Sequence, residues 1–383
     1  MNEVQPFELH VPDAVLADLR ERLGRTRFLD DSPRRPPAGV TADYLRELVT
    51  TWLDWDWRAR EAWLNAHPQF LSDLDGTRIH FAHLRSASRG EPGERGERPA
   101  PALLAMHGWP HTFALQLDFA DRLPDFDVVV ASLPGFGVAE PYVDGPMSET
   151  RLAETMHRLM TEVLGYERYL TYGEDVTANV SDLIAASHPD HVAGILATHA
   201  HFPTTDERAA LTEPDERAFF DALAARHETD GAYGHVQSTR PDTLAVALND
   251  SPAGLLAWLV EKLVEWSDTP PGDPAAVERR ISRDRILTEA MLYWATESIG
   301  TSFRPYYEGA DTPDPIPPAS VPAAVFIQRH EAAYPESLAR RHYRDLRVFE
   351  RLDAGGHFTA AEVPDALAER MRAFAQSLGL LDG

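Results

Sequence analysis

The sequence predicts an α/β protein with a mostly parallel central sheet, a helical N-terminal extension and a helical insert late in the chain. The first observation is a series of short apolar segments that alternate with helical segments, which is typical of a doubly wound sheet. The second is that this alternation stops between residues 203 and 305, where the pattern is mostly helical. We therefore divide the chain into four parts: an N-terminal helical region at 1–76, the first part of the core at 77–202, a helical lid at 203–308, and the second part of the core at 309–383.

The N-terminal region has two helical patterns. Residues 11–28 begin with the helix-start residues Pro12 and Asp13 and then place apolar side chains at helical spacing. Residues 41–65 continue in the same style with four tryptophans. We expect the first eighty residues to be helical and to pack on the core and the lid, because so apolar a stripe has to be buried.

The core is expected to consist of strands with helices between them. The segment 77–85 alternates as a half-buried strand does, and five further segments are continuous apolar runs or return to strand character. These are 102–110, 127–137, 192–199, 321–328 and 344–352. Another strand ends at Tyr172, and helices are expected at 112–123, 149–165, 177–187 and 362–378. In such a sheet, the functional site lies at the carboxyl ends of the strands.

Composition excludes several classes of function. The net charge of −25 argues against nucleic acid and anionic membranes as partners, because both would be repelled. The absence of cysteine excludes disulfides, thiolate metal sites and cysteine nucleophiles. The first residues lack the pattern of a secretory signal, and the longest apolar run, near 253–260, is too short to span a bilayer. We expect a soluble, cytoplasmic protein without a membrane anchor.

Asp175 lies in the stretch YGEDVTAN, between a strand and a helix. A strand-turn-helix elbow of this kind presents its central residue to the cleft, where many hydrolases carry a nucleophile. An aspartate before a helix is also a common N-cap, so both roles are open on this motif alone. Thr177 occupies the position two residues on, where glycine is the usual residue.

Two further features follow predicted strands. In HGWP, the backbone amides of Gly108 and Trp109 could form an oxyanion hole with that of Val176, or simply close a tight turn. The Trp109–Pro110 bond is a candidate cis peptide. His357 follows two glycines after the last strand, where a catalytic base would be placed, although a lone histidine is more often structural. Glu331 follows the strand at 321–328 and could orient it.

Together these motifs give the chain a resemblance to a known family. HGWP, SLPGFG, GGHF, the N-terminal helices and the segment 233–268 resemble the epoxide hydrolases of the α/β-hydrolase superfamily, in the group related to the microsomal and juvenile-hormone enzymes. The resemblance covers nearly the whole chain. It implies an α/β-hydrolase fold, a hydrophobic organic epoxide and water as substrates, and a reaction that needs no metal or organic cofactor.

Carried over position by position, the resemblance makes Asp175 the nucleophile, His357 the base and Glu331 the acid that orients it. The order of nucleophile, acid and histidine is that of α/β-hydrolases. The family usually has Phe-Pro two and three residues before the acid, where this chain has Gln328 and Arg329.

The resemblance also places two tyrosines in the lid. Tyr233 and Tyr306 would donate hydrogen bonds to the epoxide oxygen, with Tyr307 as the rival for the second role. The oxyanion hole would consist of the Gly108, Trp109 and Val176 amides. The expected substrate-binding residues are Trp109, Val176, Tyr307 and Phe358.

Other functions stay open. A haloalkane dehalogenase also uses an aspartate nucleophile, but such enzymes commonly place a halide-binding tryptophan directly after it, and Val176 has no side-chain N–H. A non-catalytic ligand-binding protein on the same fold is a further alternative. The sequence does not decide the physiological epoxide, a role in biosynthesis or detoxification, or whether the protein is a homodimer.

Overall fold

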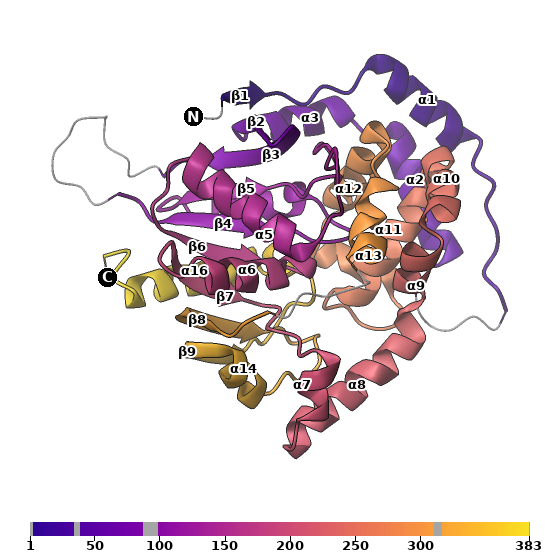
Figure 1. Ribbon diagram of the computed structural model, residues 1–383. Coiled ribbons are helices and arrows are strands. Elements are labelled where there is room, and N and C mark those ends of the chain that lie inside the picture. Colours follow the sequence, from indigo (N-terminus) through magenta and orange to yellow (C-terminus); the bar gives the residue numbers. More distant parts are fainter. Residues whose placement is uncertain (1–2, 34–38, 87–98, 310–315, 383) are drawn as a thin grey trace.

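The computed structural model describes residues 3–33, 39–86, 99–309 and 316–382. At its centre lies a nine-stranded sheet with the order β1-β2-β3-β5-β4-β6-β7-β8-β9 (Figure 1). The strands are β1 (Val4–Phe7), β2 (Gln69–Leu74), β3 (Thr77–Leu84), β4 (Ala102–Met106), β5 (Asp127–Ala131), β6 (Tyr169–Gly173), β7 (Val192–Ala197), β8 (Ala319–Ile327) and β9 (Tyr343–Arg351). The strands from β5 to β9 are parallel, and β1, β2 and β3 extend the sheet in antiparallel fashion. The carboxyl ends of β4, β6, β7 and β8 therefore meet at one edge.

The N-terminal segment differs from the helical expectation because it supplies two strands of the sheet. β2 pairs with β3 through a two-residue hairpin, in which Asp75 and Gly76 both have positive φ, 55° and 79°. An Asp-Gly pair is a strong signal for this turn, and the sequence analysis missed it. β1 has only four residues and forms only by pairing with β2, so it has no local signature of its own.

The N-terminal helices are α1 (Asp13–Gly24), α2 (Ala42–Asp54) and α3 (Trp57–Asn65). The single helix expected at 41–65 is broken because Trp55 is extended and the side chain of Asp56 accepts a hydrogen bond from the amide of Ala59, which starts α3. An aspartate at this position caps a new helix more favourably than it continues an old one.

The core helices are α4 (Leu117–Asp121), α5 (Glu149–Arg158), α6 (Val176–Ser187), α14 (Glu336–His342), α15 (Thr359–Glu362) and α16 (Pro364–Ser377). In Figure 1, α5 and α6 lie in front of the sheet, and α16 passes behind it. Both faces of the parallel strands are thus covered, which explains why every residue of β4, β5, β6 and β7 is buried.

The insert follows β7 and consists of α7 (Thr205–Ala209), α8 (Pro214–Asp230), α9 (Ala232–Thr239), α10 (Pro241–Asp250), α11 (Pro252–Trp266), α12 (Arg283–Thr296) and α13 (Arg304–Glu308). It lies beyond one edge of the sheet, and the N-terminal helices wrap around it (Figure 1). Trp55 donates to Asp284 at 2.9 Å and Tyr44 donates to Glu278 at 3.0 Å, so polar bonds as well as apolar packing join the two regions.

α11 is the apolar segment that the sequence analysis singled out in the insert, and it starts where Ser251 accepts a hydrogen bond from the amide of Gly254. Its apolar face packs against α12 and against α1 and α2. Across the described residues, no single helix is long and apolar enough to cross a membrane. The pair α10 and α11 meets that test jointly, with a bend of 118° between them.

Candidate active site

Asp175 occupies a strained turn between β6 and α6. Its backbone has φ 57° and ψ −132°, a conformation that L-residues rarely adopt, and its side chain makes no capping hydrogen bond to α6. Such strain costs on the order of 1–3 kcal/mol and is found mainly where it serves a function. Of the two roles left open by the sequence, the geometry favours the exposed tip of an elbow over the N-cap.

The elbow closes without glycine two residues after Asp175. The hydroxyl of Thr177 donates to the carbonyl of Met106 at 3.0 Å and lies 2.7 Å from the carbonyl of Glu174, so a threonine fits this place and ties α6 to the end of β4. The positions at which the backbone leaves no room for a side chain are Gly173 and Gly108. A Cβ on Gly173 would lie 2.0 Å from the carbonyl oxygen of Thr177, and one on Gly108 would lie 2.3 Å from Cβ of Asp175.

The carboxylate of Asp175 is held by backbone amides. The amide of Trp109 donates to Oδ1 at 3.2 Å, and the backbone of Val176 helps to lower the pKa of the carboxyl. The Trp109–Pro110 bond is cis, in agreement with the sequence expectation. Gly108 differs from its predicted role, because its amide faces Nε2 of His111 at 3.4 Å. Gly108 therefore contributes by lacking a side chain, and two amides, not three, face the carboxylate.

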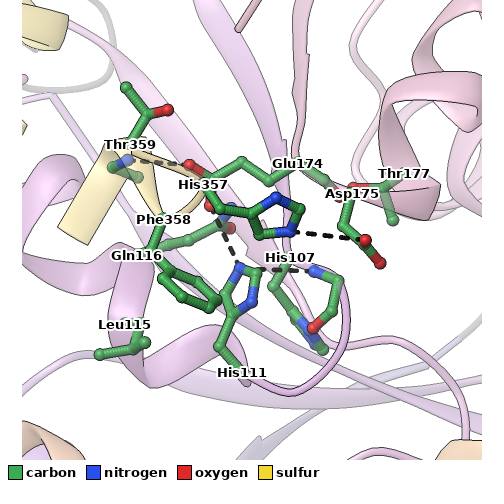
Figure 2. A network of polar contacts seen from close by, with 12 residues as sticks. His107, His111, Leu115, Gln116, Glu174, Asp175, Thr177, His357, Phe358 and Thr359 are labelled. Carbon is green, nitrogen blue, oxygen red and sulfur yellow. Dashed lines mark hydrogen bonds and ion pairs between the residues drawn. The ribbon is translucent and has the colours of Figure 1, made fainter. Parts of the chain in front are cut away.

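His357 lies between the two carboxylates that the sequence assigned to it. Nε2 is 3.4 Å from Oδ2 of Asp175 (Figure 2). On the other side of the ring, Nδ1 is 3.7 Å from Oε1 of Glu331. The backbone amide of His357 donates to the carbonyl of Trp266 at 2.9 Å, which fixes the loop against the end of α11. The three predicted residues thus converge from the ends of β6, β8 and β9.

Gln328 and Arg329 join the loop of Glu331 to that of His357. The Gln328 side chain donates to the hydroxyl of Thr359 at 2.8 Å. Arg329 donates to Asp268 at 3.2 Å, and the same carboxylate accepts from the amide of Gly355 at 3.1 Å. These polar links give the two residues a positioning role in the place where relatives were expected to have Phe-Pro.

The charged groups at the site stabilise one another's ionised forms and so shift one another's pKa values. Burial disfavours the imidazolium of His357, but the neighbouring carboxylates of Asp175 and Glu331 outweigh burial and raise its pKa to about 10. Burial likewise opposes the ionised form of Asp175, yet the proximity of His357 lowers its pKa. The pKa of Glu331 is also lowered against burial, through His357 and Arg226. At neutral pH the free protein therefore holds an imidazolium between two carboxylates.

Two residues of this network were missed by sequence reasoning. His199, after β7, accepts a hydrogen bond from the amide of Asp175 on Nδ1 at 3.3 Å, and its Nε2 lies 3.2 Å from Nδ1 of His357. Burial, followed by the charge of His357, lowers the pKa of His199 to about 4, so this ring stays neutral. Arg226, on α8 of the insert, donates to Oε2 of Glu331 at 2.9 Å. The only signal in the sequence for either residue was the position of His199 at the end of a strand.

Glu174, beside Asp175, points away from it into the core (Figure 2). It accepts from Tyr172 at 2.6 Å and from the amide of Ala360 at 2.8 Å, and it pairs with His111 at 3.1 Å. Burial opposes its charge, but these bonds bring its pKa to about 2. Through these contacts, Glu174 fixes the elbow to the core.

A cavity of about 460 Å³ opens above Asp175. Tyr233 and Tyr306 both line it, with ring centroids 5.9 Å apart, and Tyr233 stacks on Trp109 at 5.2 Å. Apolar side chains complete the wall: Phe136, Val176, Phe202, Phe219, Leu223 and Ile327. Trp109 and Val176 thus lie where substrate binding was predicted.

Two predicted substrate-binding residues do not line this cavity. Phe358 is fully buried and packs edge-on against His111 and His357, because its side chain fills the space beneath the histidine loop. Tyr307 is half-buried on α13 and lies off the cavity, since α13 turns the next residue away when Tyr306 faces inward. Of the two rivals for the second phenol, the cavity favours Tyr306.

Comparisons with known proteins identify the family of the chain. Residues 4–115 match the family model described as the epoxide hydrolase N terminus, and residues 101–357 match that of the alpha/beta hydrolase fold. A relative from Stigmatella aurantiaca, whose name assigns it to the epoxide hydrolases, is 34% identical over 96% of this chain and 84% of its own length. Epoxide hydrolase 1 from Sus scrofa is 29% identical over 99% of this chain and 89% of its own.

Solved structures give the same result. The juvenile hormone epoxide hydrolase of Bombyx mori superposes with a TM-score of 0.83 at 26% identity, covering 100% of this chain and 96% of that one. The Aspergillus niger epoxide hydrolase superposes with a TM-score of 0.80 at 26% identity, covering 98% and 97%. The chain therefore belongs to the epoxide hydrolases of the α/β-hydrolase fold that carry the N-terminal epoxide hydrolase region.

Proposed function

We propose that this epoxide hydrolase converts a hydrophobic organic epoxide to a vicinal diol through an ester on Asp175. The observation that carries the proposal is the arrangement of this carboxylate at the strained tip of an elbow, with one oxygen on the amide of Trp109 and the other facing His357. The apolar wall of the cavity supports a hydrophobic substrate, because most small-molecule sites combine apolar walls with a few polar anchors.

In the first step, a carboxylate oxygen of Asp175 attacks one carbon of the epoxide, and the bond from that carbon to the ring oxygen breaks. The departing oxygen is a poor leaving group and needs a proton. Tyr233 and Tyr306 line the cavity with Asp175 and are the donors we assign to it. One phenol gives its proton to the alkoxide, which leaves an alkyl ester and a hydroxyl on the neighbouring carbon.

Esterification then makes His357 a base. The charge of Asp175 helps to raise the pKa of His357 in the free protein, and that charge disappears when the ester forms. The imidazolium can now return a proton to the phenolate. Neutral His357, oriented by Glu331, takes a proton from water, and the resulting hydroxide attacks the ester carbonyl.

The tetrahedral intermediate carries its negative charge on the carboxyl oxygen near the amides of Trp109 and Val176, which already face that group. Its collapse releases the diol and regenerates the Asp175 carboxylate and the His357 imidazolium. An aspartate suits this chemistry because its ester can be hydrolysed, whereas a serine would form an alkyl ether that water does not readily cleave.

A labelling experiment tests this route. When excess wild-type protein turns over once in H₂¹⁸O, the new diol oxygen should be ¹⁶O from Asp175, and the label should appear in the peptide that contains this residue. Mass spectrometry of diol and peptide reads both. Direct attack of water on the epoxide would instead place ¹⁸O in the diol during the first turnover and would refute the ester.

The tyrosine pair yields a second prediction. Tyr233→Phe and Tyr306→Phe should each slow ester formation, and the double variant should lose about 10²- to 10⁴-fold, because positioned acids contribute on this scale. Rapid-quench measurement of ester formation isolates this step. Tyr307→Phe, one residue away and off the cavity, is the matched control and should retain the wild-type rate. If all three single variants slowed ester formation equally, Tyr233 and Tyr306 would not be the proton donors.

A further inference from the structure

Two ion pairs join helix α8 of the insert to the core. Near the start of α8, both carboxylate oxygens of Glu216 accept from Arg341 of α14, at 2.9 and 3.0 Å. Near its end, Nη1 of Arg226 donates to Oε2 of Glu331 at 2.9 Å. Since α8 leads from α7 to the other helices of the insert (Figure 1), both pairs tie the insert to the core. Of the two pairs, the second ends on a side chain of the catalytic site.

Arg226 holds one oxygen of Glu331 and leaves the other for His357. Oε1 of Glu331 is buried without a hydrogen-bond partner among the described residues, and it faces Nδ1 of His357 at 3.7 Å. Of the two cationic side chains that face Glu331 in the described part of the chain, Arg226 is the closer. The last torsion of a glutamate side chain is soft, so a cation held on one carboxylate oxygen determines where the other oxygen points.

The other polar contacts of this loop hold its backbone. Gln328 donates to the histidine loop, and Arg329 donates to Asp268. Arg351 donates to the backbone carbonyl of Glu331 at 3.0 Å. These contacts place the loop but do not reach the carboxylate of Glu331, so the direction of that group depends on a separate contact.

Arg226 lies on the face of α8 that covers the substrate cavity. Phe219 and Leu223 line the cavity from this helix, and Arg226 follows Leu223 at a spacing that keeps side chains on one face. Further along the chain, Tyr233 lines the same cavity from the start of α9. The guanidinium therefore lies between the apolar wall of the insert and one of the phenols assigned to the epoxide oxygen.

The pair between Glu216 and Arg341 already docks α8 on the core. The side chain of Glu216 is 0% exposed, and both of its oxygens are bonded in the forked arrangement that is strong between arginine and a carboxylate. Arg226 instead places one nitrogen on one oxygen of Glu331. Such a contact adds less to docking than the fork does, but it leaves the second oxygen of Glu331 for the imidazole.

We propose that Arg226 is a positioning residue of the ester-hydrolysis step, in which it keeps Oε1 of Glu331 directed at Nδ1 of His357. The proposal rests on the ester mechanism above, where Glu331 orients His357 while the imidazole takes a proton from water. Ring opening by Asp175 does not use Glu331, so the loss of Arg226 affects the second step and spares the first. Because Arg226 belongs to the insert, the base is oriented for hydrolysis only while α8 covers the cavity.

Single-turnover rapid quench with the full chain tests this role by following the formation and the decay of the ester on Asp175. The substrate is an epoxide that the wild type converts, with styrene oxide as the first probe. In Arg226→Gln, decay should slow by about 10²-fold, the cost of displacing a catalytic group by about 1 Å, while formation keeps the wild-type rate. Arg226→Met should match it, and Arg226→Lys, which keeps a cation and an N–H donor, should recover most of the decay rate.

Glu216→Gln is the matched control, because it weakens the other ion pair of α8 and should leave both rates unchanged. Circular dichroism and the melting temperature establish that each variant is folded. If Arg226→Gln slowed formation and decay equally, or if Glu216→Gln slowed decay as much, the ion pair of Arg226 would only dock the insert and the proposal would be wrong. Decay at the wild-type rate in Arg226→Gln would also overturn it.

A double variant shows whether Arg226 acts through Glu331. Glu331→Gln alone should slow decay, and adding Arg226→Gln should slow it no further, because both substitutions remove the same interaction. Losses that add up would mean that Arg226 acts by another route and would contradict the proposal. A wild type that forms no ester at all would instead refute the proposed function, so the two failures are distinguishable.

Discussion

Asp175→Asn should abolish diol formation, with a loss in kcat of about 10⁴-fold or more, equivalent to roughly 5.5 kcal/mol. The amide cannot act as the nucleophile, yet it has nearly the same volume and tolerates the positive φ of this position. Asp175→Ala should be equally inactive but less stable, because alanine suits that backbone poorly. Gas chromatography of the diol, together with the melting temperature, separates the loss of chemistry from a loss of fold.

The asparagine variant has a second expected effect, on the titration of His357. Without the Asp175 charge, the pKa of His357 should fall from about 10. In the wild type, the raised pKa stabilises the fold fully below the unfolded value of about 6.5, and this contribution is lost as the pH rises towards 10. The melting temperature of the wild type relative to the variant should therefore decline over that window.

NMR titration of the His357 ring measures the pKa directly. Asp54→Asn, an exposed residue at the end of α2, is the matched control and should leave both activity and the His357 titration unchanged. An asparagine variant that still forms diol at the wild-type rate would exclude Asp175 as the nucleophile. An unchanged pKa of His357 would show that the two side chains are not coupled.

His357→Gln should accumulate the ester intermediate, because ring opening needs Asp175 and the phenols, while hydrolysis needs the imidazole. We expect the protein mass to increase by the mass of one epoxide, and steady-state turnover to fall by about 10²- to 10⁴-fold, the usual contribution of a positioned base. Intact-protein mass spectrometry after mixing shows the adduct, and peptide mapping should place it on Asp175. The adduct should form in a rapid burst with one equivalent per active site.

The matched control is His330→Gln. His330 lies close to Glu331 in the chain, but its Nε2 contacts the carbonyl of Glu265 at 3.1 Å and it does not line the cavity. This variant should turn over normally and show no adduct. Normal turnover in His357→Gln would contradict the two-step scheme, and an adduct on another residue would place the nucleophile elsewhere.

The sequence by itself determined the features that are recorded locally along the chain. The apolar runs fixed the parallel core strands, and the interruption after β7 located the helical insert. Asp175, Glu331 and His357 were expected to meet, as they do, because each follows a strand whose carboxyl end falls at the same edge of the sheet. The cis bond at Pro110 was found because only proline commonly allows it.

The tertiary structure decided what depends on contacts between distant segments. β1 exists only through its pairing with β2. The amide of Gly108 donates to His111 and is therefore not aimed at the carboxylate of Asp175. Arg226 reaches Glu331 across 105 positions of sequence. Periodicity reports which face of an element is buried, whereas the identity of the neighbour across that face is set by how the elements pack.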